Sequence, residues 1–184
     1  PDSAPAQFLY AESLARAGDM DQAREKLTRA IELNAKYLPA RIGEIKMLVN
    51  AGEVAKAKER LPALRAEFGT RPEVLGIEGW FALGTGDFAT AADRFSALLE
   101  SNQDVELKVL YIRSLWGKED FDNAISLMNR WLEERPDDLV IGMHLAGAYL
   151  SLEKDEQARE AYAKVIQHYP DHIPALNNLA WLSR

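Results

Sequence analysis

Three histidines are the residues whose type and spacing first suggest chemistry. His168 and His172 are four residues apart, a spacing at which two side chains of one helix can share a metal ion. Pro170 lies between them, and a proline at this place ends a helix. Asp171 alone would be a poor third ligand. We therefore expect no metal site and no cofactor.

Paired carboxylates are the second candidates, and Glu133–Glu134 and Asp137–Asp138 are examples. Glycosidic chemistry needs two carboxylates that face each other across a cleft, one of them in an apolar setting that raises its pKa. With 29 acidic residues in the chain, neighbouring pairs are common, and neither pair is set apart in this way. No serine or cysteine nucleophile motif is present. We predict no catalytic residue and no enzymatic activity.

The glycines of the run GWFALGTGD could suggest a phosphate-binding loop. Such a loop needs a following Lys-Ser or Lys-Thr and usually follows a strand. Neither condition is met. Gly79 and Gly86 instead fall where the pattern described below places a helix crossing and an inter-helix turn.

The composition fits a folded protein, with 47% apolar and 28% charged residues among 184. The net charge of −7 argues against binding to nucleic acid or to an anionic membrane, both of which favour clustered Lys and Arg. No apolar run approaches the roughly 18 residues needed to cross a bilayer, so we expect no membrane insertion. Because the chain begins with Pro1, we expect a fragment of a longer protein.

The main regularity of the sequence is a ladder of five alanines with spacings of 34, 34, 33 and 34 residues. Four residues after each alanine comes a large apolar residue. This pattern predicts pairs of antiparallel helices, in which the alanine lies where the second helix crosses the first and the large residue fills the adjacent space. The alanines are Ala23, Ala57, Ala91, Ala124 and Ala158, and the large residues are Leu27, Leu61, Phe95, Met128 and Tyr162.

Five residues before each alanine, the sequence marks the turn between the two helices. Gly18, Gly52 and Gly86 occupy this place in the first three repeats, whereas Glu119 and Glu153 occupy it in the last two. Glycine supplies backbone angles there that other residues reach only with strain.

These features resemble the tetratricopeptide repeat family. The resemblance covers nearly the whole chain and implies an all-α, right-handed superhelical solenoid of antiparallel helix pairs. We expect one domain over residues 1–184, with about five repeats and a final helix. We also expect Pro62 to kink its helix or delay its start, and Trp131, which replaces an alanine, to open its repeat locally. The repeats are 4–37, 38–71, 72–104, 105–138 and 139–172, and the final helix is 173–184.

In this family the first helix of each pair lines a concave groove in which ligands usually bind. The resemblance therefore implies a non-enzymatic scaffold for a protein or peptide partner. A chaperone carboxylate clamp is excluded for the first three repeats, because none of its five expected side chains is present. The groove positions of this chain hold Phe8, Glu12, Lys46, Asn50, Ile77, Trp80, Arg113, Trp116, His144, Asn177, Asn178 and Trp181.

The C-terminal half also resembles bacterial tetratricopeptide lipoproteins of the PEP-CTERM/exosortase system, which accompany exopolysaccharide production. The ending NNLAWL after a proline-closed repeat carries this resemblance. It implies a periplasmic or envelope-anchored parent protein. Two alternatives remain open: a polysaccharide-handling element of a secretion complex, and the regulatory arm of an enzyme elsewhere in the chain. Self-association through the C-terminal end, at Leu176, Leu179 and Trp181, is a further expectation.

Overall fold

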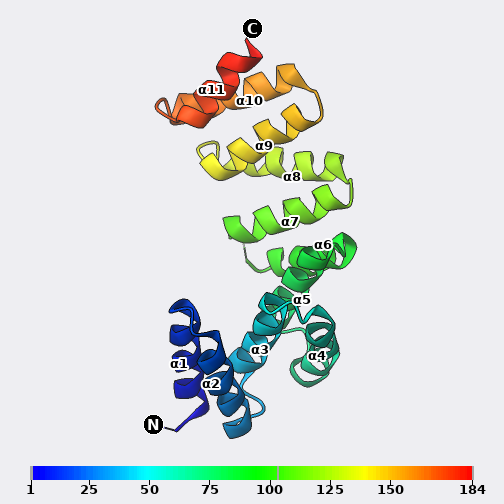
Figure 1. Cartoon of the computed structure of the whole chain (residues 1–184). Coiled ribbons are helices and arrows are strands. Elements are labelled where there is room, and N and C mark those ends of the chain that lie inside the picture. The colour runs from blue at the N-terminus through cyan, green and yellow to red at the C-terminus, as the bar shows by residue number, and fades with distance from the viewer. Residues whose placement is uncertain (1, 103, 184) are drawn as a thin grey trace. The chain divides into compact units, whose positions relative to one another are not determined.

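The computed structural model describes residues 2–102 and 104–183; Pro1, Gln103 and Arg184 lie outside the described residues. Within the described residues the chain forms eleven helices and no strand (Figure 1), which confirms the all-α prediction. First and second helices alternate along the chain. The first helices are α1 (Ala4–Arg16), α3 (Leu38–Asn50), α5 (Pro72–Thr85), α7 (Val105–Gly117), α9 (Leu139–Ser151) and α11 (Ile173–Leu182). The second helices are α2 (Met20–Leu33), α4 (Val54–Phe68), α6 (Phe88–Leu99), α8 (Phe121–Glu134) and α10 (Asp155–His168).

The chain divides into two compact units, Pro1–Glu78 (unit 1) and Gly79–Arg184 (unit 2), and the division falls within α5. In unit 1, α1 contacts both α2 and α3, and α3 contacts α4. In unit 2, each helix from α6 to α11 contacts the next along the chain, and the first helices α7 and α9 also meet (Figure 1). Each helix lies within the repeat predicted for it. The expectation of a single domain stays a prediction.

The alanine ladder lies at the helix crossings. All five alanines are 0% exposed, and Leu27, Phe95, Met128 and Tyr162 beside them are buried, whereas Leu61 is half-buried. In repeat 3 a glycine of the first helix also lies at the crossing, where a Cβ added to Gly79 would lie 2.8 Å from Cε1 of Phe95. The small residues therefore set how closely the helices of a pair pack, as their spacing indicated.

The five turns between first and second helices share one geometry. In each, a backbone N–H donates to the carbonyl oxygen five residues earlier, as from Asp19 to Leu14 at 3.0 Å and from Lys154 to Tyr149 at 2.9 Å. The residue before that donor has a positive φ, between 57° at Glu153 and 87° at Gly18. This is the hydrogen-bond pattern of a helix that ends on a left-handed residue.

Aspartates that follow the turns fix the starts of two second helices. The carboxylate of Asp19 accepts the backbone N–H of Gln22 at 3.2 Å, and that of Asp87 accepts the N–H of Thr90 at 3.1 Å. Each bond satisfies one of the donors that a helix leaves free at its first turn.

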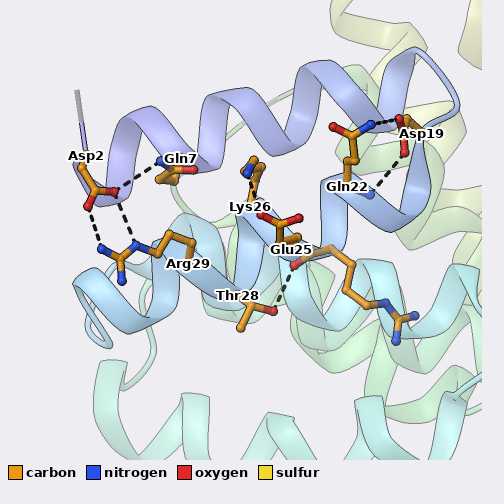
Figure 2. A network of polar contacts seen from close by, with 9 residues as sticks. Asp2, Gln7, Asp19, Gln22, Glu25, Lys26, Thr28 and Arg29 are labelled. Carbon is orange, nitrogen blue, oxygen red and sulfur yellow. Dashed lines mark hydrogen bonds and ion pairs between the residues drawn. The ribbon is translucent and has the colours of Figure 1, made fainter.

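Exposed polar contacts join the two helices of the first pair (Figure 2). Arg29 of α2 donates to the carboxylate of Asp2 at 2.6 Å, and Gln7 of α1 donates to the same carboxylate at 3.4 Å. The hydrogen bond from Arg29 is the main cause that lowers the pKa of Asp2, and the same bond raises the pKa of Arg29. Because these groups are exposed, their contribution to stability is small.

Pro62 does not delay its helix. Helix α4 begins at Val54 and continues past Pro62 to Phe68, so the late start does not occur, while the alternative expectation of a kink stays a prediction. Pro62 is exposed, and water can therefore hydrate the carbonyl oxygen four residues earlier that loses its N–H donor.

Trp131 is enclosed by its repeat. Its side chain is 5% exposed, and its indole N–H donates to Oδ2 of Asp138 at 2.7 Å. The Nζ atom of Lys108 lies 2.7 Å from the ring centroid, and the guanidinium of Arg135 lies 4.7 Å from it. Burial lowers the pKa of Lys108, which is only 4% exposed. Trp131 is therefore part of the core of unit 2.

Candidate interaction surface

A hollow of about 570 Å³ lies between the first helices α1 and α3 of unit 1. Its walls include Phe8 of α1 and Ile42 and Met47 of α3. The apolar wall is stabilised by an edge-to-face contact between Phe8 and Tyr37, whose ring centroids are 5.8 Å apart. We call this surface the unit 1 hollow.

Both signs of charge occur around the unit 1 hollow. Lys46 and Arg71 are its cations, and Glu12 and Glu73 are its carboxylates. Glu12 pairs within α1 with Arg16 at 3.8 Å, and the Arg16 side chain is 80% exposed. Four of the predicted groove residues meet here: Phe8, Glu12, Lys46 and Asn50.

A second hollow, of about 600 Å³, lies between the first helices α7 and α9 of unit 2. Its apolar walls contain Ile112, Met128 and Met143. Trp116 also lines it, and the Trp116 ring packs on Phe121 with a centroid distance of 4.6 Å. We call this surface the unit 2 hollow.

The polar groups of the unit 2 hollow come from α7 and α9. Arg113 is exposed, and His144 lies on the same surface. Nδ1 of His144 donates to the carbonyl oxygen of Val140 at 2.8 Å, which leaves Nε2 of the ring available to a partner. The structure therefore brings together three more of the predicted groove residues: Arg113, Trp116 and His144.

The other predicted groove residues lie outside the two hollows. Ile77 is 3% exposed, which leaves little of its side chain for a partner, and Trp80 is half-buried on α5. Nδ2 of Asn178 donates to the Tyr162 hydroxyl at 3.1 Å, while burial raises the pKa of that hydroxyl. Asn177 and Trp181 are exposed on α11, Trp181 at 58%.

Several residues that line the unit 2 hollow were not predicted from the sequence. Gly147 and Ser151 of α9 line the unit 2 hollow, as does Phe88 from the start of α6. The side chain of Phe88 occupies the space that a Cβ of Gly117 would need. Only the contact between these two positions identifies Phe88, and the repeat spacing carries no sign of it.

Unit 2 also has a hollow of about 520 Å³ on its second-helix side, between α8 and α10. It is lined by Glu133 and Asp137, by Glu160 and by Lys164. Its rim is partly occupied by internal bonds, since the hydroxyl of Tyr169 donates to the carbonyl oxygen of Asp137 at 2.6 Å. This surface is an alternative place at which a partner could bind.

The described residues contain no cluster of three or more His, Asp or Glu that could hold a metal ion. His172 has a structural role, because its Nδ1 accepts the backbone N–H of Ala175 at 3.3 Å and so begins α11. Over residues 2–102 and 104–183, no helix is long and apolar enough to span a bilayer.

Solved structures of similar fold cover nearly all of this chain. A chain of the APC/C hetero-tetramer Cut9–Hcn1 is 23% identical with a TM-score of 0.67; the match covers 98% of this chain but only 36% of that one. YrrB, described as a TPR protein with an unusual peptide-binding site, is 20% identical with a TM-score of 0.68, over 93% of this chain and 89% of its own. PilF of Pseudomonas aeruginosa is 15% identical with a TM-score of 0.75, over 98% and 82%. At these identities the likeness concerns the fold.

The comparison with curated proteins finds no match. Family models give the assignment instead. One model described as tetratricopeptide repeat matches residues 14–80 and 115–182, and a second with the same description matches residues 78–138. The buried alanines, the five shared turns and these matches together show that the chain belongs to the tetratricopeptide repeat family.

Proposed function

We propose that this chain is a non-enzymatic scaffold that binds a peptide or helical segment of another protein on the faces of its first helices. The observation that carries the proposal is that the first helices of each unit surround an open hollow with apolar walls and charged groups at its edge. Tetratricopeptide repeat proteins generally act as non-enzymatic scaffolds, and the peptide-binding site named for YrrB supports a peptide ligand.

The binding mechanism follows from the two kinds of lining residue. Apolar walls supply free energy by burial, at about 25 cal/mol per Å² of apolar surface removed from water. Charged and amide groups contribute mainly orientation and register, because solvent-exposed charge pairs add little affinity. On this basis Met47 and Met143 bury partner side chains, while Lys46 and Arg113 orient the segment.

A peptide selection tests the proposal. Twelve-residue peptides selected by display against the whole chain are measured again on Lys46→Glu and Gly147→Leu, one variant for each hollow. Lys58→Glu on α4 and Gly84→Leu at the end of α5 are the matched controls, because both residues are exposed and lie outside the two hollows.

We expect each selected peptide to lose about tenfold or more in affinity on one hollow variant, the effect of an unfavourable contact near 1.4 kcal/mol. Both controls should retain binding, and all four variants should melt near the parent temperature. Peptides that bind both hollow variants as tightly as the parent would refute the proposal.

The assignment to bacterial exopolysaccharide or protein-sorting machinery rests on the resemblance of the C-terminal half and stays a prediction. The polysaccharide alternative depends on Trp181 with Asn177 and Asn178, and the amide of Asn178 already bonds to Tyr162. A glycan array without binding would remove it. Self-association through the exposed Leu176 and Trp181 is checked by sedimentation of the variant Trp181→Ser, which should shift any dimer to monomer.

A further inference from the structure

Two glycines of helix α9 have different surroundings. A Cβ added to Gly142 would lie 2.9 Å from Cγ2 of Val165, so packing against α10 requires glycine there. A Cβ added to Gly147 would meet nothing within 4 Å, and Gly147 lines the unit 2 hollow. Glycine inside a helix lowers stability relative to alanine. Gly147 therefore carries a cost that no contact within the chain explains, and it leaves the hollow open at this point.

The charge of the unit 2 hollow differs from that of the chain as a whole. The chain has 29 Asp and Glu against 22 Lys and Arg. Among the described residues that line the unit 2 hollow, none is acidic, and Arg113 and His144 are present. In the unit 1 hollow, by contrast, Glu12 and Glu73 offset Lys46 and Arg71.

Arg113 is well placed to receive an anionic partner. It is exposed and makes no ion pair with the other described residues. A guanidinium presents paired N–H donors that match the two oxygens of a carboxylate. Nδ1 of His144 is held by the Val140 carbonyl oxygen, so Nε2 can receive a partner's donor or, once protonated, donate to a carboxylate.

We infer that the unit 2 hollow binds a protein segment in which an apolar side chain is flanked by carboxylates. The apolar side chain enters above Gly147 beside Met143, whose flexible thioether side chain adapts to its shape. The flanking carboxylate bonds to Arg113. This inference rests on the proposed function and adds to it the chemistry of the partner. Charge complementarity selects this occupant, because the lining of the hollow has Arg113 and no carboxylate among the described residues. The rest of the chain, with its net charge of −7, repels an acidic segment.

Two pools of fluorescein-labelled nonapeptides serve as the probe. Both carry Leu or Phe at the centre; the flanks are Asp and Glu in one pool and Lys and Arg in the other. Fluorescence anisotropy with the whole chain should give the acidic pool about tenfold tighter binding, because Arg113 attracts the flanks of one pool and repels those of the other, and the two effects multiply. The preference should weaken as salt rises. Equal binding of the pools, tighter binding of the basic pool, or no binding of either would overturn the inference.

Variants locate the preference. Arg113→Glu should abolish or reverse the ratio between the pools, whereas Arg113→Lys should keep its sign with a smaller value, because Lys lacks the bidentate geometry. Gly147→Leu should weaken binding of the acidic pool to the level that the unit 1 hollow alone provides, and Gly84→Leu should not weaken it. An acidic preference that survives Arg113→Glu would overturn the inference.

The outcomes separate this inference from the proposed function. Suppose that display-selected peptides no longer bind Gly147→Leu but show no preference for acidic flanks. This result would refute the proposed chemistry of the partner and leave the scaffold proposal standing. Peptides unaffected by Lys46→Glu and by Gly147→Leu would refute the scaffold proposal and this inference with it.

Discussion

The two hollows place similar surfaces on the same kind of helix but differ in charge. In unit 1, both carboxylates and cations line the hollow together with Phe8, Ile42 and Met47. In unit 2, Arg113 and His144 stand beside Trp116 without a lining carboxylate among the described residues. Since both hollows use the first helices of the repeats, we propose that the backbone determines where a partner can lie. On this proposal, the side chains at a few positions of each first helix determine which partner binds.

The units also differ at equivalent positions of their second helices. The position seven residues after the ladder alanine holds Ala30 and Leu64 in unit 1 and Leu98, Trp131 and Val165 in unit 2, and all five are buried. The corresponding turns carry Gly18 and Gly52 in unit 1 but Glu119 and Glu153 in the last two repeats of unit 2. Unit 2 therefore departs further from the repeat pattern, at Trp131 and at these two turns.

The largest effect is expected from removing Trp131. Trp131→Ala should lower the free energy of unfolding of unit 2 by about 3–5 kcal/mol, because it leaves a cavity and removes the ring that Lys108 contacts. Denaturant unfolding measures the loss. Amide exchange should accelerate in α7, α8 and α9 while that of α1 and α2 stays unchanged. A loss below 1 kcal/mol, within the range typical of surface positions, would mean that Trp131 is not a core residue.

Alanine at the two glycines of α9 should act in opposite directions. Gly142→Ala should destabilise the chain by about 1–3 kcal/mol through overpacking against Val165. Gly147→Ala should stabilise it by about 0.5–1 kcal/mol, because the helix gains propensity and the Cβ meets no neighbour. Thermal melts of the pair measure both signs. If Gly147→Ala also destabilises the chain, other side chains of the protein must fill the space at Gly147.

The turns provide a smaller test of the difference between units. Glu119 and Glu153 have φ values of 61° and 57°, which cost a residue with a Cβ more than glycine. Glu119→Gly should therefore raise the free energy of unfolding by about 0.5–1 kcal/mol. This value is the backbone strain that glycine relieves minus the conformational entropy that glycine loses on folding. The reciprocal change Gly18→Ala should lower it by a similar amount. Equal stability of both variants and the parent would show that the left-handed turns carry no strain.

The smallest effect concerns the carboxylates of unit 1. Replacing Glu12 or Glu73 by Gln should make the unit 1 hollow more like that of unit 2. Each change should tighten binding of the acidic nonapeptide pool by about two- to fivefold, the effect of one exposed charge pair. The titration is made on Gly147→Leu, so that unit 2 does not contribute. Weaker binding would mean that Glu12 and Glu73 do not repel an acidic partner from the unit 1 hollow.

The fold followed closely from sequence because its regularity is local. The alanine spacing and the glycine turns fix helix pairs, and each helix lies within the repeat expected for it. The late start, one of the two outcomes expected at Pro62, does not occur, since an exposed proline can be tolerated once water hydrates the freed carbonyl oxygen. For the proposed site, the family register identified Lys46 and Arg113, which line the two first-helix hollows. It could not identify Gly147 or Phe88, whose roles depend on distances between helices, or the burial of Ile77.

The absence of cysteine from the chain permits a direct measurement of where a partner binds. Single cysteines are introduced at Asn50, at Ser151 and at Lys164 on the second-helix side, and each is labelled with an environment-sensitive fluorophore. Addition of a display-selected peptide should shift the emission of the label at position 50 or 151 and leave position 164 unchanged. A shift confined to position 164 would contradict the account, because it would place the partner between α8 and α10.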